Sequence, residues 1–162
     1  MKYKLSVELK KYAGQLDNKL EEIVNQTLDY TYKELIDAMP VRNGVYLNNT
    51  DIDYAKRDSD GLIKGRVYNN VMTARSGKWR NVPLACLLEW GTGIVGQGSN
   101  TYPHGYPYRQ TPWTYYDEYL HMLVTTNGMI ARPHWYPTYE KASIKIEQLL
   151  KERLWEKIYK RN

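Results

Sequence analysis

Apolar and polar positions in the first part of the chain recur with the period of an α-helix. Between Leu9 and Met39, apolar residues stand three, four or seven positions apart, and charged residues fall mainly between them. Met39-Pro40 predicts the end of this helix, because the residue before a proline disfavours helical dihedral angles. The expected apolar stripe consists of Ala13, Leu16, Leu20, Ile23, Val24, Thr27 and Leu35.

The middle of the chain has the shorter, alternating runs that are typical of strands. Residues 51–56 and 62–68 flank a turn-forming cluster, Arg57-Asp58-Ser59-Asp60-Gly61, and together they predict a hairpin. A second hairpin is predicted where residues 113–116 and 119–124 surround Asp117-Glu118. The apolar run from Val82 to Trp90 fits either a strand or a short helix, and its length does not decide between them.

The remaining segments are a long connection and a second helix. Residues 91–112 contain several glycines and prolines without periodicity, so they predict an extended loop that is functional or mobile. An amphipathic helix is expected from about Pro137 to Tyr159, with Thr138 as its N-cap. The predicted fold is therefore a single α+β domain over residues 1–162. An antiparallel sheet carries the N-terminal and C-terminal helices on one face, with the loop 91–112 and the hairpin 113–126 added.

Composition limits the broad class of protein. The chain has 162 residues, of which 42% are hydrophobic and 25% charged, values that suit one globular core. It contains 16 Tyr and 5 Trp but no Phe. Tyr and Trp suit surfaces that become buried on assembly, but Tyr replacing Phe in the core explains the same counts.

Charge and cysteine content favour a protein that is made and kept in a cytoplasm. Cys86 is the only cysteine, so an intrachain disulfide framework is excluded. No apolar run approaches the roughly 20 residues that span a bilayer, and a membrane partner is not expected. The formal net charge of +5 permits contact with DNA or with an acidic partner but does not require it.

The residues that could carry catalysis do not form a recognisable set. Glu89 has no second acid or histidine near it in the sequence, and His104, His121 and His134 lack the spacing of metal ligands. Cys86 lies in an apolar run that would raise the pKa of its thiol and reduce its reactivity. The sequence thus predicts a protein that is not an enzyme and that uses no cofactor or metal.

One basic stretch could contact nucleic acid. Arg75, Lys78 and Arg80 surround Trp79, and cations mixed with an aromatic ring suit phosphate contact without base reading. A solvated loop is the alternative interpretation of the same residues. The three cations are the candidate DNA-facing side chains.

The most informative motif consists of two segments far apart in the chain. Leu88-Glu89-Trp90-Gly91-Thr92-Gly93 is followed by Gly128-Met129-Ile130-Ala131-Arg132-Pro133-His134-Trp135, and an earlier Pro40…Gly44…Leu47 segment follows the first helix. This arrangement resembles the tail-completion or neck proteins, minor head–tail joining components of long-tailed double-stranded DNA phages. Asn43-Gly44 stands where the family more often has an Asp-Thr-Gly turn. The motif residues are Pro40, Gly44, Leu47, Glu89, Gly91, Thr92, Arg132 and Pro133.

The resemblance implies a structural protein of the virion at the head–tail junction, assembled in the host cytoplasm. It implies a homo-oligomeric ring that joins a portal-side connector or stopper protein to a tail terminator or tail tube protein and lets DNA pass. Glu89 is expected where a backbone N–H or an Arg can satisfy it, with Arg132 as the candidate partner. The alternative is that Glu89 is a solvated strand residue and that Arg132 points into water. The candidate interface residues are the aromatic side chains Tyr102, Tyr106, Tyr108, Trp113, Tyr115, Tyr116 and Tyr119.

Two other classes remain open from the residues alone. The basic charge and aromatic loops also suit a small DNA-binding or DNA-processing protein. Loops rich in Tyr and Trp also suit a glycan-binding module, because aromatic rings stack on sugars.

Overall fold

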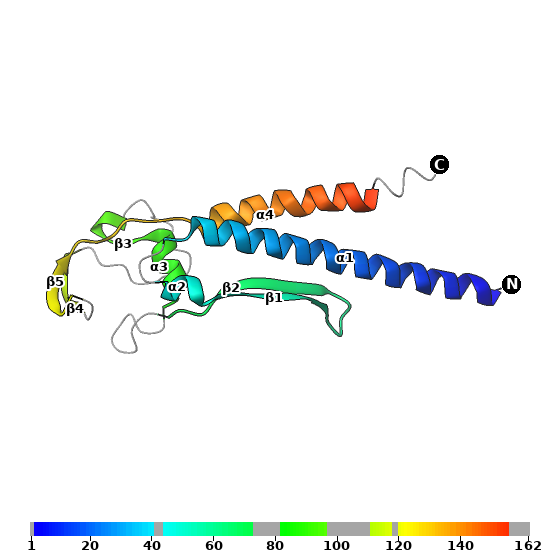
Figure 1. Ribbon diagram of the computed structural model, residues 1–162, viewed down its shortest axis with the longest axis horizontal. Coiled ribbons are helices and arrows are strands. Elements are labelled where there is room, and N and C mark those ends of the chain that lie inside the picture. Colours follow the sequence, from blue (N-terminus) through cyan, green and yellow to red (C-terminus); the bar gives the residue numbers. More distant parts are fainter. Residues whose placement is uncertain (1, 41–43, 73–81, 97–110, 118–119, 156–162) are drawn as a thin grey trace. The chain divides into compact units, whose positions relative to one another are not determined.

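A computed structural model describes residues 2–40, 44–72, 82–96, 111–117 and 120–155 of the chain. It is a mixed α+β structure with a long N-terminal helix, antiparallel strand pairs and a C-terminal helix, so the predicted fold class is confirmed (Figure 1). The elements are α1 (Lys2–Ala38), α2 (Val45–Asn48), β1 (Thr50–Arg57), β2 (Ile63–Asn69), α3 (Leu84–Trp90), β3 (Thr92–Gly93), a 3-10 turn (Ile94–Gly96), β4 (Trp113–Asp117), β5 (Met122–Thr126), β6 (Gly128–Met129), α4 (Trp135–Leu150) and a π-helical turn (Lys151–Trp155).

The chain divides into two compact units. Unit 1 consists of residues 1–37, 50–68 and 138–162, and unit 2 consists of residues 38–49 and 69–137. The single domain expected from the sequence stays a prediction.

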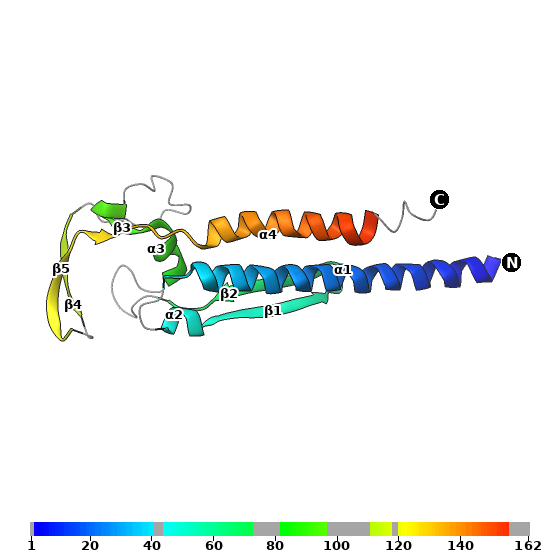
Figure 2. The same ribbon diagram turned by 45° about the horizontal axis from the view of Figure 1, so that its top comes forward.

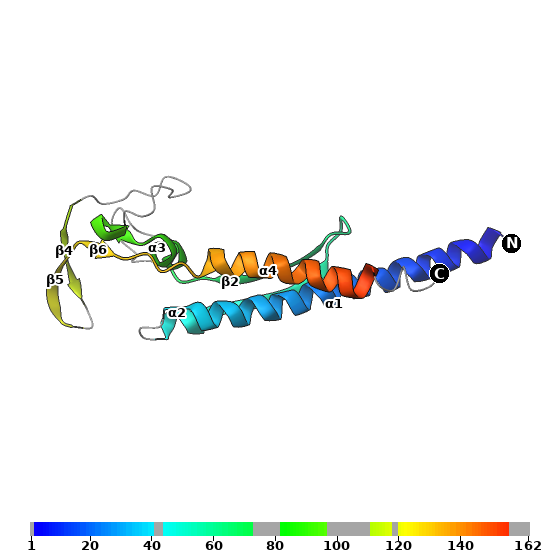
Figure 3. The ribbon, with the colours of Figure 1, turned by 90° about the horizontal axis from the view of Figure 1, so that it is seen from above.

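In unit 1, α1 lies between α4 and the β1–β2 hairpin (Figures 1 and 2). Lys141 of α4 binds Glu34 of α1, and Arg153, beyond α4, binds Glu22. Because residue numbers rise along one helix as they fall along the other, the two helices are antiparallel. Figure 3 shows that the first turns of α1 extend past α4 and past the tip of the hairpin.

The core of unit 1 forms along the predicted stripe of α1. Ile23 and Leu35 are 1% and 0% exposed. Leu16 is 47% exposed, so this position of the predicted stripe is not part of the core. Leu149 of α4 is also buried, and Ala55 of β1 is buried with its backbone N–H donated to Asn25 Oδ1 of α1 over 2.7 Å.

The β1–β2 hairpin confirms the first strand prediction. Asp58 closes its turn, because its Oδ1 accepts the backbone N–H groups of Asp60 and Leu62. Gly61 has a φ of 81°, in the left-handed region that favours glycine. Gly65 of β2 lies close to α1, since a Cβ built there would be 2.5 Å from Leu28 Cδ1.

Unit 2 contains the other helices and strands. β3 pairs with β6, and β4 pairs with β5 in a register that sets Trp113 opposite Thr126 and Asp117 opposite Met122. The second predicted hairpin is thus confirmed, although β5 begins at Met122 rather than at Tyr119. The described strands form three two-stranded sheets rather than one larger sheet.

Two local predictions are decided by this structure. The run from Val82 to Trp90 is mainly helical, because α3 occupies Leu84–Trp90. The prediction of Thr138 as an N-cap is wrong, because α4 begins at Trp135 and Thr138 lies inside it, 3% exposed. Pro137 is tolerated in the first turn, where its missing N–H costs no helical hydrogen bond.

Candidate functional site

The two segments that carry the family resemblance lie side by side in unit 2. The first runs from the end of α3 through Gly91 into β3, and the second runs from β6 toward α4. Several contacts join them: Thr92 pairs with Met129, the Met129 N–H donates to Thr92 Oγ1 over 3.0 Å, and the Arg132 N–H donates to the Leu88 carbonyl over 2.8 Å. The two segments therefore form one structural site.

Glycines permit this close approach of two backbones. Gly91 has a φ of 72°, and a Cβ there would lie 2.5 Å from the Met129 carbonyl oxygen and 2.6 Å from the Ala131 nitrogen. Gly93 and Gly128 also have positive φ angles, and a Cβ on Gly128 would lie 1.9 Å from the Thr92 oxygen. Side chains of any size are excluded at these positions by backbone atoms, which have little room to move.

Glu89, at the end of α3, caps the N-terminus of α4. Its Oε2 accepts the backbone N–H groups of His134 and Trp135 over 2.7 and 2.9 Å, and its Oε1 accepts that of Tyr136 over 2.9 Å. The first N–H groups of a helix have no partner inside the helix, and the helix dipole favours a negative charge beside them. The Glu89 side chain is 5% exposed, so its charge is stabilised mainly by these three donors.

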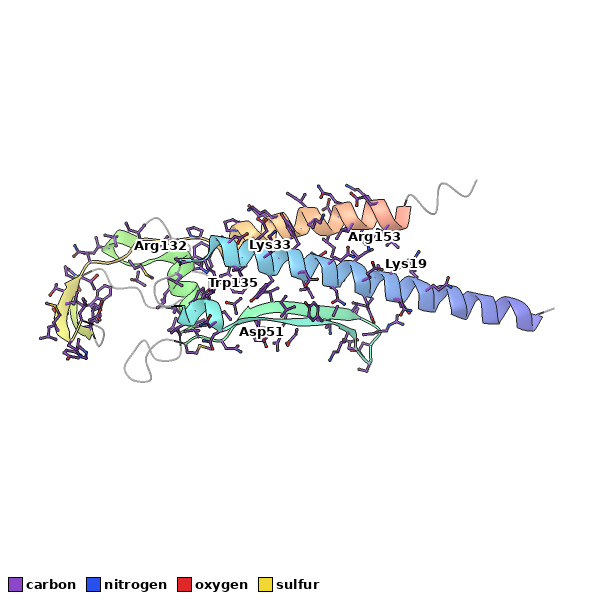
Figure 4. The ribbon with its side chains drawn as sticks, viewed as in Figure 1. Lys19, Lys33, Asp51, Arg132, Trp135 and Arg153 are labelled. Atoms are coloured by element: carbon purple, nitrogen blue, oxygen red, sulfur yellow. The ribbon has the colours of Figure 1, made fainter. Side chains whose placement is uncertain are left out.

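The predicted ion pair between Glu89 and Arg132 does not form. Arg132 is exposed, and the salt bridges among the described residues do not join it to Glu89. Figure 4 labels Arg132 and Trp135 on the segment that leads from β6 into α4. The Glu89 carboxylate instead accepts hydrogen bonds from backbone N–H groups. A backbone N–H was the other group that the sequence indicated could satisfy it.

Three aromatic side chains continue the site beyond Glu89. His134, which is 0% exposed, has its Nδ1 2.8 Å from the Arg132 carbonyl and its Nε2 3.0 Å from the Tyr46 hydroxyl. The Arg132 carbonyl can only accept, so Nδ1 donates to it, and the Tyr46 hydroxyl lies within hydrogen-bond distance of Nε2. Trp135 Nε1 donates to the Tyr46 oxygen over 2.7 Å. The network joins α2 to the start of α4.

Burial raises the pKa of two groups, Tyr46 in this network and Cys86 of α3. Desolvation is the main reason that the pKa of Tyr46 is raised from 10.0 to about 12, and the negative charge of Glu89 adds to it against the opposing Trp135 hydrogen bond. The pKa of Cys86 is raised by desolvation and then by Glu89. A thiol with a raised pKa is a poor nucleophile at neutral pH, as the sequence suggested.

The raised pKa of Tyr46 predicts a loss of stability in alkali. Between pH 10 and pH 12 the unfolded chain releases this proton while the folded protein keeps it, so the contribution is full below pH 10 and is lost as pH rises toward 12. Two pH units correspond to about 3 kcal/mol. Urea unfolding measures the free energy of unfolding at each pH. Between about pH 9 and pH 12 this free energy should fall less in Tyr46→Phe than in the wild type, by roughly this amount. Tyr139→Phe, at a 68% exposed position, is the control, and an unchanged fall in Tyr46→Phe would contradict the assignment.

The other predicted site residues differ in their exposure. Gly44, with a φ of 76°, precedes α2, and Pro40 and Leu47 are half-buried beside it in unit 2. Tyr115 and Tyr116 are 41% and 56% exposed, and Trp113 is half-buried. Several predicted residues lie outside the described parts of the chain: Arg75, Lys78, Arg80, Tyr102, Tyr106, Tyr108 and Tyr119.

The polar groups of this site are paired with other groups of the protein. Both Glu89 oxygens and both His134 ring nitrogens are engaged by protein groups in a buried position. No group of three or more His, Cys, Asp or Glu residues that could hold a metal ion occurs within the described ranges. Within those ranges, too, no helix is both long and apolar enough to cross a membrane.

Sequence reasoning missed Tyr46 and assigned no role to His134. The available signal was the resemblance itself, which placed His134 and Trp135 directly after Arg132-Pro133. Comparisons of the chain with protein-family models, with curated proteins and with solved structures gave no match.

Proposed function

We propose that this protein is a structural component of the head–tail junction of a long-tailed double-stranded DNA phage. Identical subunits form a closed ring that joins a portal-side connector or stopper protein to a tail terminator or tail tube protein. The protein works by shape and performs no catalysis. It is located in the virion after assembly in the host cytoplasm, and DNA passes through the ring.

The observation that carries the proposal is the interlocking of the two resembling segments. Glu89 caps α4 at His134, Trp135 and Tyr136, and Gly91 allows β3 to lie against β6. Residues at motif positions thus support one another mechanically. This is the expected use of a motif in a protein whose task is to hold a shape.

The exposed β4–β5 hairpin gives further support. Tyr115 and Tyr116 are exposed there together with Met122 and Leu123. Large aromatic and apolar side chains on a surface are typical of protein interfaces, where Tyr and Trp dominate binding energy. A ring subunit needs such a surface for its neighbours.

A phage that lacks this protein tests the proposal. Lysates of a null mutant should contain DNA-filled heads and separate tails, because the joining step is missing, and supplying the protein from a plasmid should restore joined particles. Negative-stain electron microscopy counts the two forms. Joined, infectious particles at wild-type frequency in the null mutant would overturn the proposal.

A further inference from the structure

We propose that the outer edge of β5 adds an extended strand from a second copy of this chain, so that subunits associate by backbone pairing at the β4–β5 hairpin. This inference deepens the proposed function. Only the statement that the second copy is a neighbour in the ring rests on that function. The self-association itself follows from features of the hairpin alone.

The first observation is that, among the residues the structure describes, β5 is paired along one edge only. Its residues pair with β4 from Met122 opposite Asp117 to Thr126 opposite Trp113, in a two-stranded sheet. Residues 122–125 make no backbone hydrogen bond to a third strand anywhere in the described ranges. The second edge of such a strand presents a row of N–H and C=O groups that another extended chain can satisfy.

The second observation concerns the side chains beside this edge. Residues opposite each other in an antiparallel pair share a face, so Tyr116 and Leu123 stand together, 56% and 67% exposed. The neighbouring pair on that face, Thr114 and Thr125, is linked by a 2.8 Å hydrogen bond between the hydroxyls. On the other face, Tyr115 and Met122 are 41% and 54% exposed. An incoming strand would therefore meet uncharged side chains on both faces.

The β1–β2 hairpin of the same protein provides an internal comparison. Its strands carry exposed charges, and Arg66 pairs with Asp53 over 2.6 Å while Lys64 pairs with Asp58 over 2.6 Å. Charged residues on exposed strands are the usual protection against unwanted strand pairing. β4 and β5 contain no Lys, Arg, Glu or Pro, and their only charged residue, Asp117, is 7% exposed. The strands of the β1–β2 hairpin thus carry the protecting charges that the strands β4 and β5 lack.

Charge also favours a second copy as the occupant. The chain has a net charge of +5, so two copies repel each other on average, and a surface without cations adds least to this repulsion. The strands of the β4–β5 hairpin have no cation, which argues against nucleic acid, whose phosphates require Lys or Arg. A strand of the same hairpin from another copy meets the requirement for an uncharged, extended partner.

The short length of β4 and β5 indicates that side chains must also take part in the interface between two copies. A stable protein interface buries roughly 1,600 Å² in total, more than a five-residue strand pair provides alone. The exposed Tyr116 and Leu123 side chains are therefore expected to be covered as well. This makes Leu123 a sensitive position, because a charge there would be buried only in the assembly and not in the monomer.

The test combines self-association with hydrogen exchange on the full chain. Sedimentation of the wild-type protein should show association as concentration rises. Amides of residues 122–126 should then exchange about tenfold more slowly, while those of β1 do not change. Leu123→Lys should weaken association about tenfold or more, equivalent to about 1.4 kcal/mol. Leu62→Lys is the matched control, since Leu62 is 54% exposed near the tip of the other hairpin.

Three results would overturn the inference: a monomer at every concentration, association without added protection of β5, or association of Leu123→Lys at the wild-type strength. These results are independent of the phage phenotype. A null mutant with separate heads and tails would support the proposed function even if β5 proved not to pair, and the reverse also holds.

Discussion

Replacement of Glu89 with Ala is expected to lower the free energy of unfolding by about 3–5 kcal/mol. The change leaves the N–H groups of His134, Trp135 and Tyr136 without their acceptor, and hydrogen bonds to a charged group contribute about 1.5–3 kcal/mol each without adding fully. Glu89→Gln should also destabilise the protein, because its amide group would place a donor against backbone donors. Denaturant unfolding followed by circular dichroism measures both.

Glu140 offers the matched control for this change. It is an exposed carboxylate on the same helix, α4, and Glu140→Gln should change stability by no more than about 0.5 kcal/mol. If Glu89→Gln and Glu140→Gln had equal effects, Glu89 would not be the cap of α4. The two interlocked segments would then lack the contact that joins α3 to the start of α4.

Gly128→Ala is expected to cost about 3 kcal/mol or more, and it should disrupt the β3–β6 pair. Gly128 has a φ of 115°, and its added Cβ would lie 1.9 Å from the Thr92 oxygen and 2.6 Å from the Thr92 carbonyl carbon. Left-handed strain alone costs about 1–3 kcal/mol in a residue other than glycine, and the backbone must move as well. Thermal unfolding and the amide spectrum of unit 2 report the loss.

Gly14→Ala controls for the same chemical change where space is free. Gly14 lies inside α1, and no described atom comes within 4 Å of the position that an alanine methyl would take there. Alanine in a helix is favoured over glycine by about 0.8–1.0 kcal/mol, so this variant should be slightly more stable than the wild type. A loss below about 1 kcal/mol for Gly128→Ala would show that β3 and β6 can separate at little cost.

The sequence predicted best those elements that depend on local pattern. The period of α1 and the proline after Met39 predicted its end correctly, because amphipathic spacing and the dihedral preference before proline act within a few residues. Both hairpins were predicted for the same reason. The grouping of the strands into sheets was not predicted. Side-chain alternation indicates that a strand exists but not which strands become its neighbours.

The start of α4 shows why contacts between distant parts of the chain were not predicted. Thr138 has the chemistry of an N-cap, but the cap is Glu89, which comes from an element distant in the chain. Local capping rules cannot detect such a partner. The expected Glu89–Arg132 pair was based on opposite charges, whereas three backbone donors satisfy the carboxylate with the help of the helix dipole. The proximity of the two segments followed from the resemblance rather than from any local pattern.

The position of the protein in the phage particle decides whether it joins head to tail. A small affinity tag at the C-terminus, labelled with gold and viewed by electron microscopy of purified phage, should place the label at the junction between head and tail. A junction protein predicts label at that position in nearly every joined particle and none along the tail tube or at its distal end. Label on the capsid shell or the tail tip, or its absence from intact particles that infect normally, would contradict this role.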